Sequence, residues 1–248
     1  MDAIILGPGP LGRAISTALL ARGDRPPRLL GRPAGERHDP AALAGGDVVF
    51  DASAAGSVVG NIEAGLSAGC RRFVIATTGW QPDVPRVGAL LERRGAAAVV
   101  APNLAIGSAV FLRLVEEAAR LFAPLADFEP YVLEWHRRAK ADRPSGTARE
   151  IVRRIAGSHP GGEPEVAVIR AGAAPGMHLV GFDASAETIE LRLTARDRSG
   201  YAAGALAAAD WLLATARAPG IHPFDEVVDD LLAARTPAAA TPSVVTAA

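Results

Sequence analysis

The amino-acid sequence predicts two domains of different class, a parallel, doubly wound α/β domain followed by an α+β domain with an open mixed sheet. In the first hundred residues, short runs of Val, Ile and Leu are separated by helical stretches, as in parallel sheets with both faces covered. From about residue 129, apolar and polar residues alternate instead, which is typical of strands with one buried face. The chain of 248 residues is long enough for both cores.

The expected elements follow in order along the chain. Apolar runs in the first domain predict strands at 3–6, 28–31, 47–53, 72–79 and 97–103, with helices near 11–22, 57–68, 83–94 and 107–122. Alternating segments predict strands at 131–136, 165–170, 177–182 and 188–195, with a helix after Ser145, and an Ala-rich stretch predicts a long helix at 201–216. We therefore expect a first domain, 1–103, completed by a C-terminal helix of about 204–235, a second domain, 104–203, and a disordered tail, 236–248.

Composition excludes several classes of function. With 49% hydrophobic and 21% charged residues, the chain resembles other globular proteins, and a net charge of −1 argues against binding to nucleic acid. The N-terminus lacks the basic segment of a signal peptide, and Pro102 interrupts the longest uncharged run, 95–112, so no membrane association is expected. The single cysteine, Cys70, excludes an intrachain disulfide, which favours a cytoplasmic protein with a buried thiol.

A glycine-rich turn joins the first expected strand to the first helix. The segment GPGPLG, residues 7–12, has the spacing GxGxxG. Gly7 permits a tight turn, Gly9 lets a pyrophosphate approach the backbone, and Gly12 lets the helix pack closely on the strand. Because phosphates bind at the N-terminus of such a helix, this context predicts a dinucleotide-binding, Rossmann-type domain. The alternative is a glycine turn with a structural role only.

The end of the second strand bears on the choice of cofactor. An acidic residue there would select NADH by binding the ribose 2′-hydroxyl. This chain has Gly31 and Arg32 instead, with no acid before Glu36. An arginine suits a 2′-phosphate, so we expect NADPH, with NADH still possible. The alternative is that Arg32 is a solvated surface residue.

The segment EWHRRAKADRPSGTA, residues 134–148, carries an isolated lysine. Of the 26 lysine and arginine residues, Lys140 is the only lysine. A lysine ammonium can give up a proton when partly desolvated, whereas an arginine guanidinium essentially cannot. We therefore expect Lys140 to transfer a proton or to pair closely with a carboxylate. The alternative is an exposed lysine in a polar loop.

Two other parts of this segment point to the same site. Strand alternation places Glu134 and His136 on one face and delivers His136, which can donate a proton near neutral pH, to the end of the strand. Glu134 can orient this imidazole or pair with Arg138. At the start of the next helix, the Ser-Gly-Thr segment 145–147 offers backbone N–H groups and hydroxyls to a carboxylate or phosphate.

Further expectations concern neighbouring residues. Either Ser145 or Thr147 can cap the helix, and Thr147 with Glu150 has the spacing of a capping box. His178 lies in the middle of an expected strand, where a packed or hydrogen-bonded histidine is more common than a catalytic one. No spacing of His, Cys and Asp predicts a metal site.

These motifs together resemble the dihydrodipicolinate reductase family. The segment 134–148 is similar to the family signature E-x-H-H-x-x-K-x-D-x-P-S-G-T-A, and GPGPLGR stands at the family's glycine loop. Four more segments match in order: FVIATTGW, APNLAIGSAVF, RAGAAPGMHLVGF and YAAGALAAADWL. The resemblance covers nearly the whole chain. It implies a Rossmann-type domain with an α+β tetramerisation domain, and hydride transfer from NAD(P)H to a cyclic, conjugated imine dicarboxylate.

The resemblance also implies roles for individual residues. With Arg32, the expected cofactor-binding residues are Gly7, Pro8, Gly9, Leu11, Gly12, Arg13, Ala52, Ser53, Thr77, Thr78, Gly79, Ala101, Pro102 and Asn103. Gly7, Gly9, Gly12 and Arg13 would hold the pyrophosphate. Residues 77–79 would line the nicotinamide, and residues 101–103 would border the cofactor and the hinge. His136 and Lys140 would act in proton donation. The dicarboxylate substrate would contact Arg137, Ser145, Gly146 and Thr147.

The chain departs from the family pattern at four positions. Arg137 replaces the second of two histidines, Leu193 replaces a later histidine, and Pro10 and Ala105 replace an arginine and a serine. The leading interpretation is a homo-oligomeric, NADPH-dependent reductase of the diaminopimelate route to lysine. The alternatives are a paralogue that reduces a different imine or enamine, and a non-catalytic NADP(H)-binding regulator.

Overall fold

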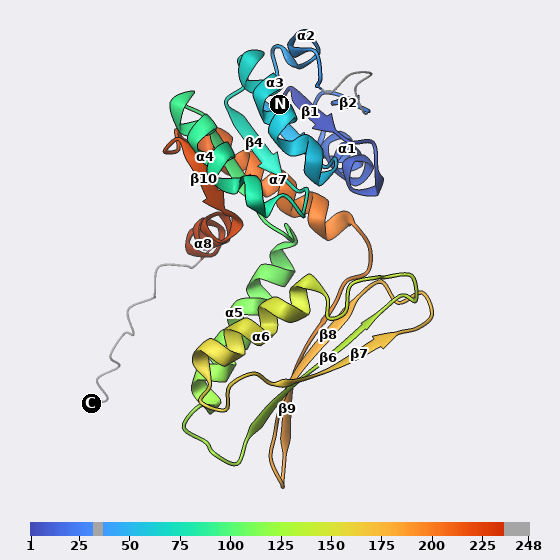
Figure 1. Ribbon diagram of the computed structural model, residues 1–248, viewed down its shortest axis with the longest axis vertical. Helices are drawn as coiled ribbons and strands as arrows, with labels where there is room; N and C mark the ends of the chain where they lie inside the picture. Colours follow the sequence, from blue (N-terminus) through green and yellow to red (C-terminus); the bar gives the residue numbers. More distant parts are fainter. Residues whose placement is uncertain (32–36, 236–248) are drawn as a thin grey trace, which may run out of the picture.

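A computed structural model of the chain, which describes residues 1–31 and 37–235, shows two lobes joined by two stretches of chain (Figure 1). The first lobe contains a six-stranded sheet in the order β10-β5-β4-β3-β1-β2, and every neighbouring pair is parallel. The second contains a four-stranded sheet in the order β7-β6-β8-β9, with one parallel and two antiparallel pairs. The predicted fold class is confirmed.

The strands of the first lobe are buried because helices cover both faces of the sheet. Its elements are β1 (Ala3–Leu6), α1 (Pro10–Arg22), β2 (Arg28–Leu30), α2 (Pro40–Leu43), β3 (Val48–Asp51), α3 (Val58–Ser67), β4 (Arg72–Ile75), α4 (Val84–Arg93), β5 (Ala97–Val100), α7 (Ser199–Ala214), β10 (Gly220–Pro223) and α8 (Phe224–Arg235). Successive side chains of β1 enter different cores. Ile5 packs with α1, α7 and α8, whereas Ile4 packs with α2, α3 and α4. The unbroken apolar runs read from the sequence are explained by this two-sided burial.

The second lobe lays two helices on one face of its sheet (Figure 1). Its elements are α5 (Ile106–Phe122), β6 (Glu129–His136), α6 (Gly146–Ser158), β7 (Glu165–Arg170), β8 (Met177–Asp183) and β9 (Thr188–Thr194). Val132, Val180 and Phe182 pack against α5 and α6. The opposite face carries Trp135 and Ile169, which are 40% and 41% exposed. One-sided burial therefore accounts for the alternating sequence pattern.

The C-terminal region differs from the single helix expected at about 204–235. It forms α7, then β10, which pairs with β5 as a sixth strand, and then α8. α7 ends at Ala214 because Thr215 is extended, and Pro219 with Gly220, which adopts φ +130°, keeps the chain from resuming a helix before β10. The segment GIHP has no apolar run, so the sequence gives little sign of this strand. The expected tail, 236–248, and Arg32 lie outside the described residues.

The two lobes are tied together where the chain crosses between them. The segment between β5 and α5 begins the second lobe, and the segment between β9 and α7 returns to the first. A Cβ atom at Gly204 would lie 1.6 Å from the Leu104 carbonyl oxygen, so α7 touches the first crossing through a position that only glycine can occupy. The Asn103 side chain accepts a hydrogen bond from Ala105 N–H and donates one to Ser108 Oγ, which fixes the start of α5. Across residues 1–31 and 37–235, no helix is long and apolar enough to span a membrane.

Candidate active site

The predicted cofactor-binding segments meet at one edge of the first sheet. They follow β1, β3, β4 and β5, and parallel strands place these carboxyl ends side by side. Gly7 adopts φ +103°, and a Cβ atom there would lie 2.3 Å from the Ala52 carbonyl oxygen. A Cβ atom at Gly12 would lie 2.0 Å from the Gly7 carbonyl oxygen. Close packing within the protein therefore requires glycine at positions 7 and 12.

Gly9 differs from its two neighbours in the glycine loop. A Cβ atom at this position would meet nothing within 4 Å, so its backbone borders open space. Gly9 is the N-cap of α1, no side chain caps the helix, and Pro10 occupies the first turn. The other N–H groups of that turn are free to bind an anion. The residues present therefore fit a dinucleotide pyrophosphate.

A buried carboxylate, which the sequence analysis did not single out, organises the loops after β3 and β4. Asp51 Oδ1 accepts hydrogen bonds from Ser53 N–H (3.0 Å), Ser53 Oγ (2.6 Å) and Thr77 Oγ1 (2.7 Å). Its Oδ2 accepts one from Asn61 Nδ2 (2.8 Å) on α3. Asp51 thus connects two predicted cofactor segments, and its place as the last residue of a buried strand is the sequence signal that marks it.

The loop predicted to face the nicotinamide is held from within the protein. Trp80 Nε1 donates a hydrogen bond of 2.9 Å to the Thr77 carbonyl, and Gly79 adopts φ +87°. Thr78 and Gly79 are exposed, whereas Thr77 is buried. The loop is therefore anchored at Thr77 and presents the two following residues to solvent.

In the second lobe, β6 places Glu134 and His136 on the inner face of the sheet, as alternation predicts. The partner of Glu134 is Arg170 at the end of β7, not Arg138. Glu134 Oε1 lies 2.5 Å from Arg170 Nη2, and both side chains are fully buried. Glu134 also accepts hydrogen bonds from Ser145 N–H at 3.0 and 3.2 Å. This buried pair joins β6 and β7 to the start of α6.

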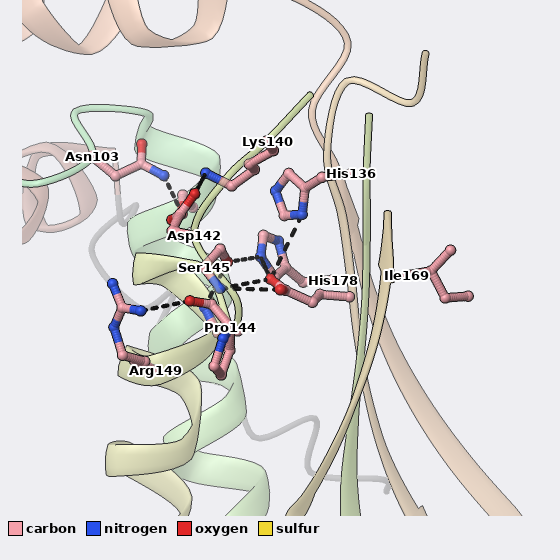
Figure 2. A network of polar contacts seen from close by, with 12 residues as sticks. Asn103, His136, Lys140, Asp142, Pro144, Ser145, Arg149, Ile169 and His178 are labelled. Atoms are coloured by element: carbon pink, nitrogen blue, oxygen red, sulfur yellow. Dashed lines mark hydrogen bonds and ion pairs between the residues drawn. The ribbon is translucent and has the colours of Figure 1, made fainter. Parts of the chain in front are cut away.

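Two imidazoles lie beside this pair (Figure 2). His136 Nδ1 and His178 Nε2 are each 3.6 Å from Glu134 Oε2, and the two rings meet edge to face with centroids 5.1 Å apart. Burial lowers the pKa of His178 to about 4, and the neighbouring His136 adds to the effect. Burial also lowers the pKa of His136, although Glu134 opposes the change. Both rings therefore favour the neutral form at neutral pH.

Ser145 is the N-cap of α6, so one of the two expected caps is confirmed. Its Oγ accepts a hydrogen bond from Ala148 N–H (3.2 Å). The capping box was wrong, because Glu150 pairs with Arg153 and Arg154 instead.

The remaining groups of Ser145 are engaged with protein atoms. The residue is 3% exposed, its N–H donates to Glu134, and its Oγ lies 3.1 Å from His178 Nε2. A neutral His178 leaves Nε2 able to accept the hydroxyl proton. The accessible part of the predicted anion cradle is therefore Gly146, which is exposed, and Thr147, which is half-buried.

Lys140 lies at the open side of this cluster. Its Nζ is 2.8 Å from Asp142 Oδ1, with side-chain exposures of 28% and 42%. The Lys140 N–H donates to the Arg137 carbonyl (3.1 Å), while the Arg137 side chain is exposed. The structure thus brings His136, Lys140, Gly146 and Thr147 to one end of the second lobe.

Two further positions bear on the chemistry of this cluster. Glu134, His136 and His178 offer ligand atoms within 4.8 Å of one another. The Arg170 guanidinium already neutralises the Glu134 carboxylate. This carboxylate therefore has a cationic partner within the protein, which disfavours a metal ion at the same place. Leu193 on β9 pairs with His178 on β8 and packs at the edge of the apolar core, so it adds no polar group here.

Comparison with known proteins assigns the family. A family model described as the C-terminus of dihydrodipicolinate reductase matches residues 107–228. A protein of Methanosarcina acetivorans named 4-hydroxy-tetrahydrodipicolinate reductase is 34% identical in an alignment of 198 residues, and the match covers 73% of this chain and 73% of that protein. A protein of Methanoregula boonei with the same name is 35% identical in an alignment of 196 residues, and the match covers 73% of this chain and 74% of that protein.

A solved structure shows the same fold. Dihydrodipicolinate reductase from Paenisporosarcina sp. TG-14, described as bound to dipicolinate, superposes with a TM-score of 0.70 at 18% identity, covering 90% of this chain and 97% of that one. The likeness extends over both lobes. With the sequence identities above, it shows that this chain belongs to the 4-hydroxy-tetrahydrodipicolinate reductase family of oxidoreductases, as its motifs predicted.

Proposed function

We propose that the chain is an NADPH-dependent reductase that transfers a hydride to a cyclic, conjugated imine dicarboxylate. The default substrate is 4-hydroxy-tetrahydrodipicolinate of the diaminopimelate route to lysine. The observation that carries the proposal is the grouping of His136, Lys140 and the open start of α6 beside the crossing to the cofactor lobe (Figure 2). The names of the relatives and the dipicolinate in the Paenisporosarcina structure support it.

The glycine loop supports a nicotinamide cofactor. Residues 7–13 would hold its pyrophosphate, and the segment 77–79 would face its nicotinamide ring. The bound cofactor supplies the hydride. We propose NADPH rather than NADH because Arg32 stands where an acid would select NADH. Dissociation constants for both cofactors test this, and Arg32→Asp should shift the preference toward NADH. Equal affinities that the substitution leaves unchanged would contradict the proposal.

The charges of the site suit an anionic substrate. The Lys140 ammonium, the Gly146 and Thr147 N–H groups and the N-terminal end of α6 all favour a carboxylate. His136 is mainly neutral in the free protein because burial lowers its pKa. A substrate carboxylate beside it would raise that pKa again, because an opposite charge stabilises the imidazolium. We propose that His136 then protonates the electron-rich product of hydride transfer, and that Lys140 restores the proton or holds the carboxylate.

An NADPH-oxidation assay with freshly generated 4-hydroxy-tetrahydrodipicolinate tests the proposal. His136→Asn should lower kcat by about 10²–10⁴-fold, the usual value of a positioned proton donor. His159→Asn is a matched control, because His159 lies at the far end of α6. Turnover that survives in His136→Asn would remove His136 from the mechanism.

Two alternatives remain, and the same assay separates them. Leu193 and Arg137 stand where the family pattern has histidines, which favours a paralogue acting on a different imine or enamine. Oxidation of NADPH with another cyclic imine, but not with this dicarboxylate, would support the paralogue. Tight cofactor binding without turnover of any imine would support a non-catalytic regulator.

We also propose that the chain forms a homo-oligomer, with a tetramer as the family resemblance implies. The outer face of the second sheet places Trp135 beside Ile169 in register, and both side chains are exposed. A second copy of the same face would remove these apolar side chains from water. Light scattering of the purified chain tests the assembly, and Trp135→Glu should shift it toward monomer. A parent chain that is monomeric at micromolar concentration would contradict it.

A further inference from the structure

Asp142 lies inside the site that the proposed function assigns to a substrate carboxylate. Its Oδ1 is 2.8 Å from Lys140 Nζ (Figure 2). It stands three residues before Ser145, the N-cap of α6, where the N–H groups of Gly146 and Thr147, which have no acceptor within the helix, begin the first turn. The Asp142 carboxylate thus pairs with the Lys140 ammonium and lies at the N-terminal end of α6. These are the two groups that would bind the carboxylate of the ligand.

The surroundings of Asp142 stabilise its ionised form. Burial acts to raise its pKa, but hydrogen bonds from Lys140 and from the Gly146 N–H, together with the Lys140 charge, lower it further than burial raises it. These are the interactions that stabilise any carboxylate at a helix N-terminus beside a cation. The Asp142 side chain is 42% exposed, so leaving the site would cost it little burial.

We propose that Asp142 is an internal occupant of the substrate-carboxylate site, and that an incoming carboxylate displaces it from Lys140 and the start of α6. The inference rests on the proposed function. In the free protein, the ion pair with Asp142 holds the Lys140 side chain at the site. On binding, the ligand carboxylate takes the place of the Asp142 carboxylate. The net gain in binding free energy is therefore smaller than the new contacts alone would provide. Asp142 would therefore set the affinity for anionic ligands.

The competing explanation has the opposite sign. If Asp142 only positions Lys140, and both stay in place when the substrate binds, removing its charge leaves Lys140 poorly placed and weakens binding. If Asp142 competes with the ligand, removing its charge strengthens binding. The direction of one affinity change therefore separates a positioning role from competition.

Isothermal titration of pyridine-2,6-dicarboxylate into the NADPH-saturated protein provides the test. Asp142→Asn keeps the size and hydrogen-bonding capacity of the side chain and removes its charge. We expect its dissociation constant to fall about two- to tenfold, the range for breaking a partly exposed ion pair and relieving a like-charge contact. Asp127→Asn is the matched control, because it makes the same charge change in the loop between α5 and β6 and should leave the constant unchanged.

A double-mutant cycle closes the test. In a Lys140→Gln background, Asp142→Asn should no longer strengthen binding, because the pair that it breaks is already absent. NADPH affinity and thermal unfolding midpoints equal to the parent's establish that each variant is folded. Weaker or unchanged binding by Asp142→Asn, with the parent binding the dicarboxylate, overturns this inference alone. No binding by the parent overturns the proposed function, and the inference with it.

Discussion

Replacing His178 with glutamine should flatten the acid side of the protein's stability profile. His178 is buried between Glu134, His136 and Ser145, and burial lowers its pKa from 6.5 to about 4. Between these two values the unfolded chain binds a proton that the folded chain does not. Stability therefore rises with pH across this window and is lost as pH falls from 6.5 toward 4. A glutamine side chain does not titrate in this window, and its carbonyl oxygen can still accept a hydrogen bond from the Ser145 hydroxyl.

The size of the effect follows from the pKa. A change from 6.5 to about 4 corresponds to roughly 3 kcal/mol of unfolding free energy across the window. Burial also lowers the pKa values of His136 and His38, so some slope remains in the variant. Carboxylates whose pKa values are lowered, such as Glu134, lose their stabilising contribution as pH falls through their ordinary value of 4.5, so they add a slope at the acid end of the window that the parent and both variants share.

The assay is urea unfolding at closely spaced pH values from 4 to 7, for the parent chain, His178→Gln and His159→Gln. The parent and His159→Gln should lose stability in parallel as the pH falls, because His159 lies outside the cluster. His178→Gln should lose roughly 3 kcal/mol less across the window. An equally steep loss in His178→Gln would show that His178 is already protonated in the folded protein, and the assignment of its proton-accepting Nε2 to the Ser145 hydroxyl would fail.

Three further predictions concern the site and the crossing. Lys140→Arg should lower kcat by about a hundredfold with little change in NADPH affinity, and steady-state kinetics that retain the parental kcat would reduce Lys140 to a charge. Thr147→Val should weaken binding of pyridine-2,6-dicarboxylate by roughly 1–3 kcal/mol, measured by calorimetry, and unchanged binding would take Thr147 out of the cradle. Gly204→Ala should lower stability by about 1–3 kcal/mol or more, because its Cβ would lie 1.6 Å from the Leu104 carbonyl; an unaltered melting temperature would mean that α7 shifts freely.

Patterns within a segment predicted more than patterns between segments. Alternation along β6 placed Glu134 and His136 on one face, and the structure agrees. The partner of Glu134 could not be found this way, because Arg170 lies 36 residues later and reaches it through the parallel register that pairs His136 with Arg170. His178 was expected to be hydrogen-bonded, and it is, but its partner Ser145 lies 33 residues away on another element.

Elements without a periodic apolar pattern were also missed. β10 has only four residues, Gly220–Pro223, and takes its strand conformation from pairing with β5. Its stability comes from tertiary packing that no local propensity records. Asp51 lies at the end of a strand that was predicted, but its role depends on Asn61 and Thr77, which three-dimensional folding brings to it.

The core of the first lobe is assembled from both ends of the chain, which has a consequence for the order of folding during synthesis. Ile5 and Phe50 share one cluster with Leu206 and Val227, and β10 covers the edge of β5. A ribosome releases β1 to β5 long before α7 and β10 exist, so five of the six strands must wait with one apolar face covered only in part, by α1. The second lobe is contiguous from α5 to β9 and has its own cluster. We expect it to fold first while the earlier-made strands remain targets for chaperones, so that truncation before α7 leaves the N-terminal lobe unable to fold.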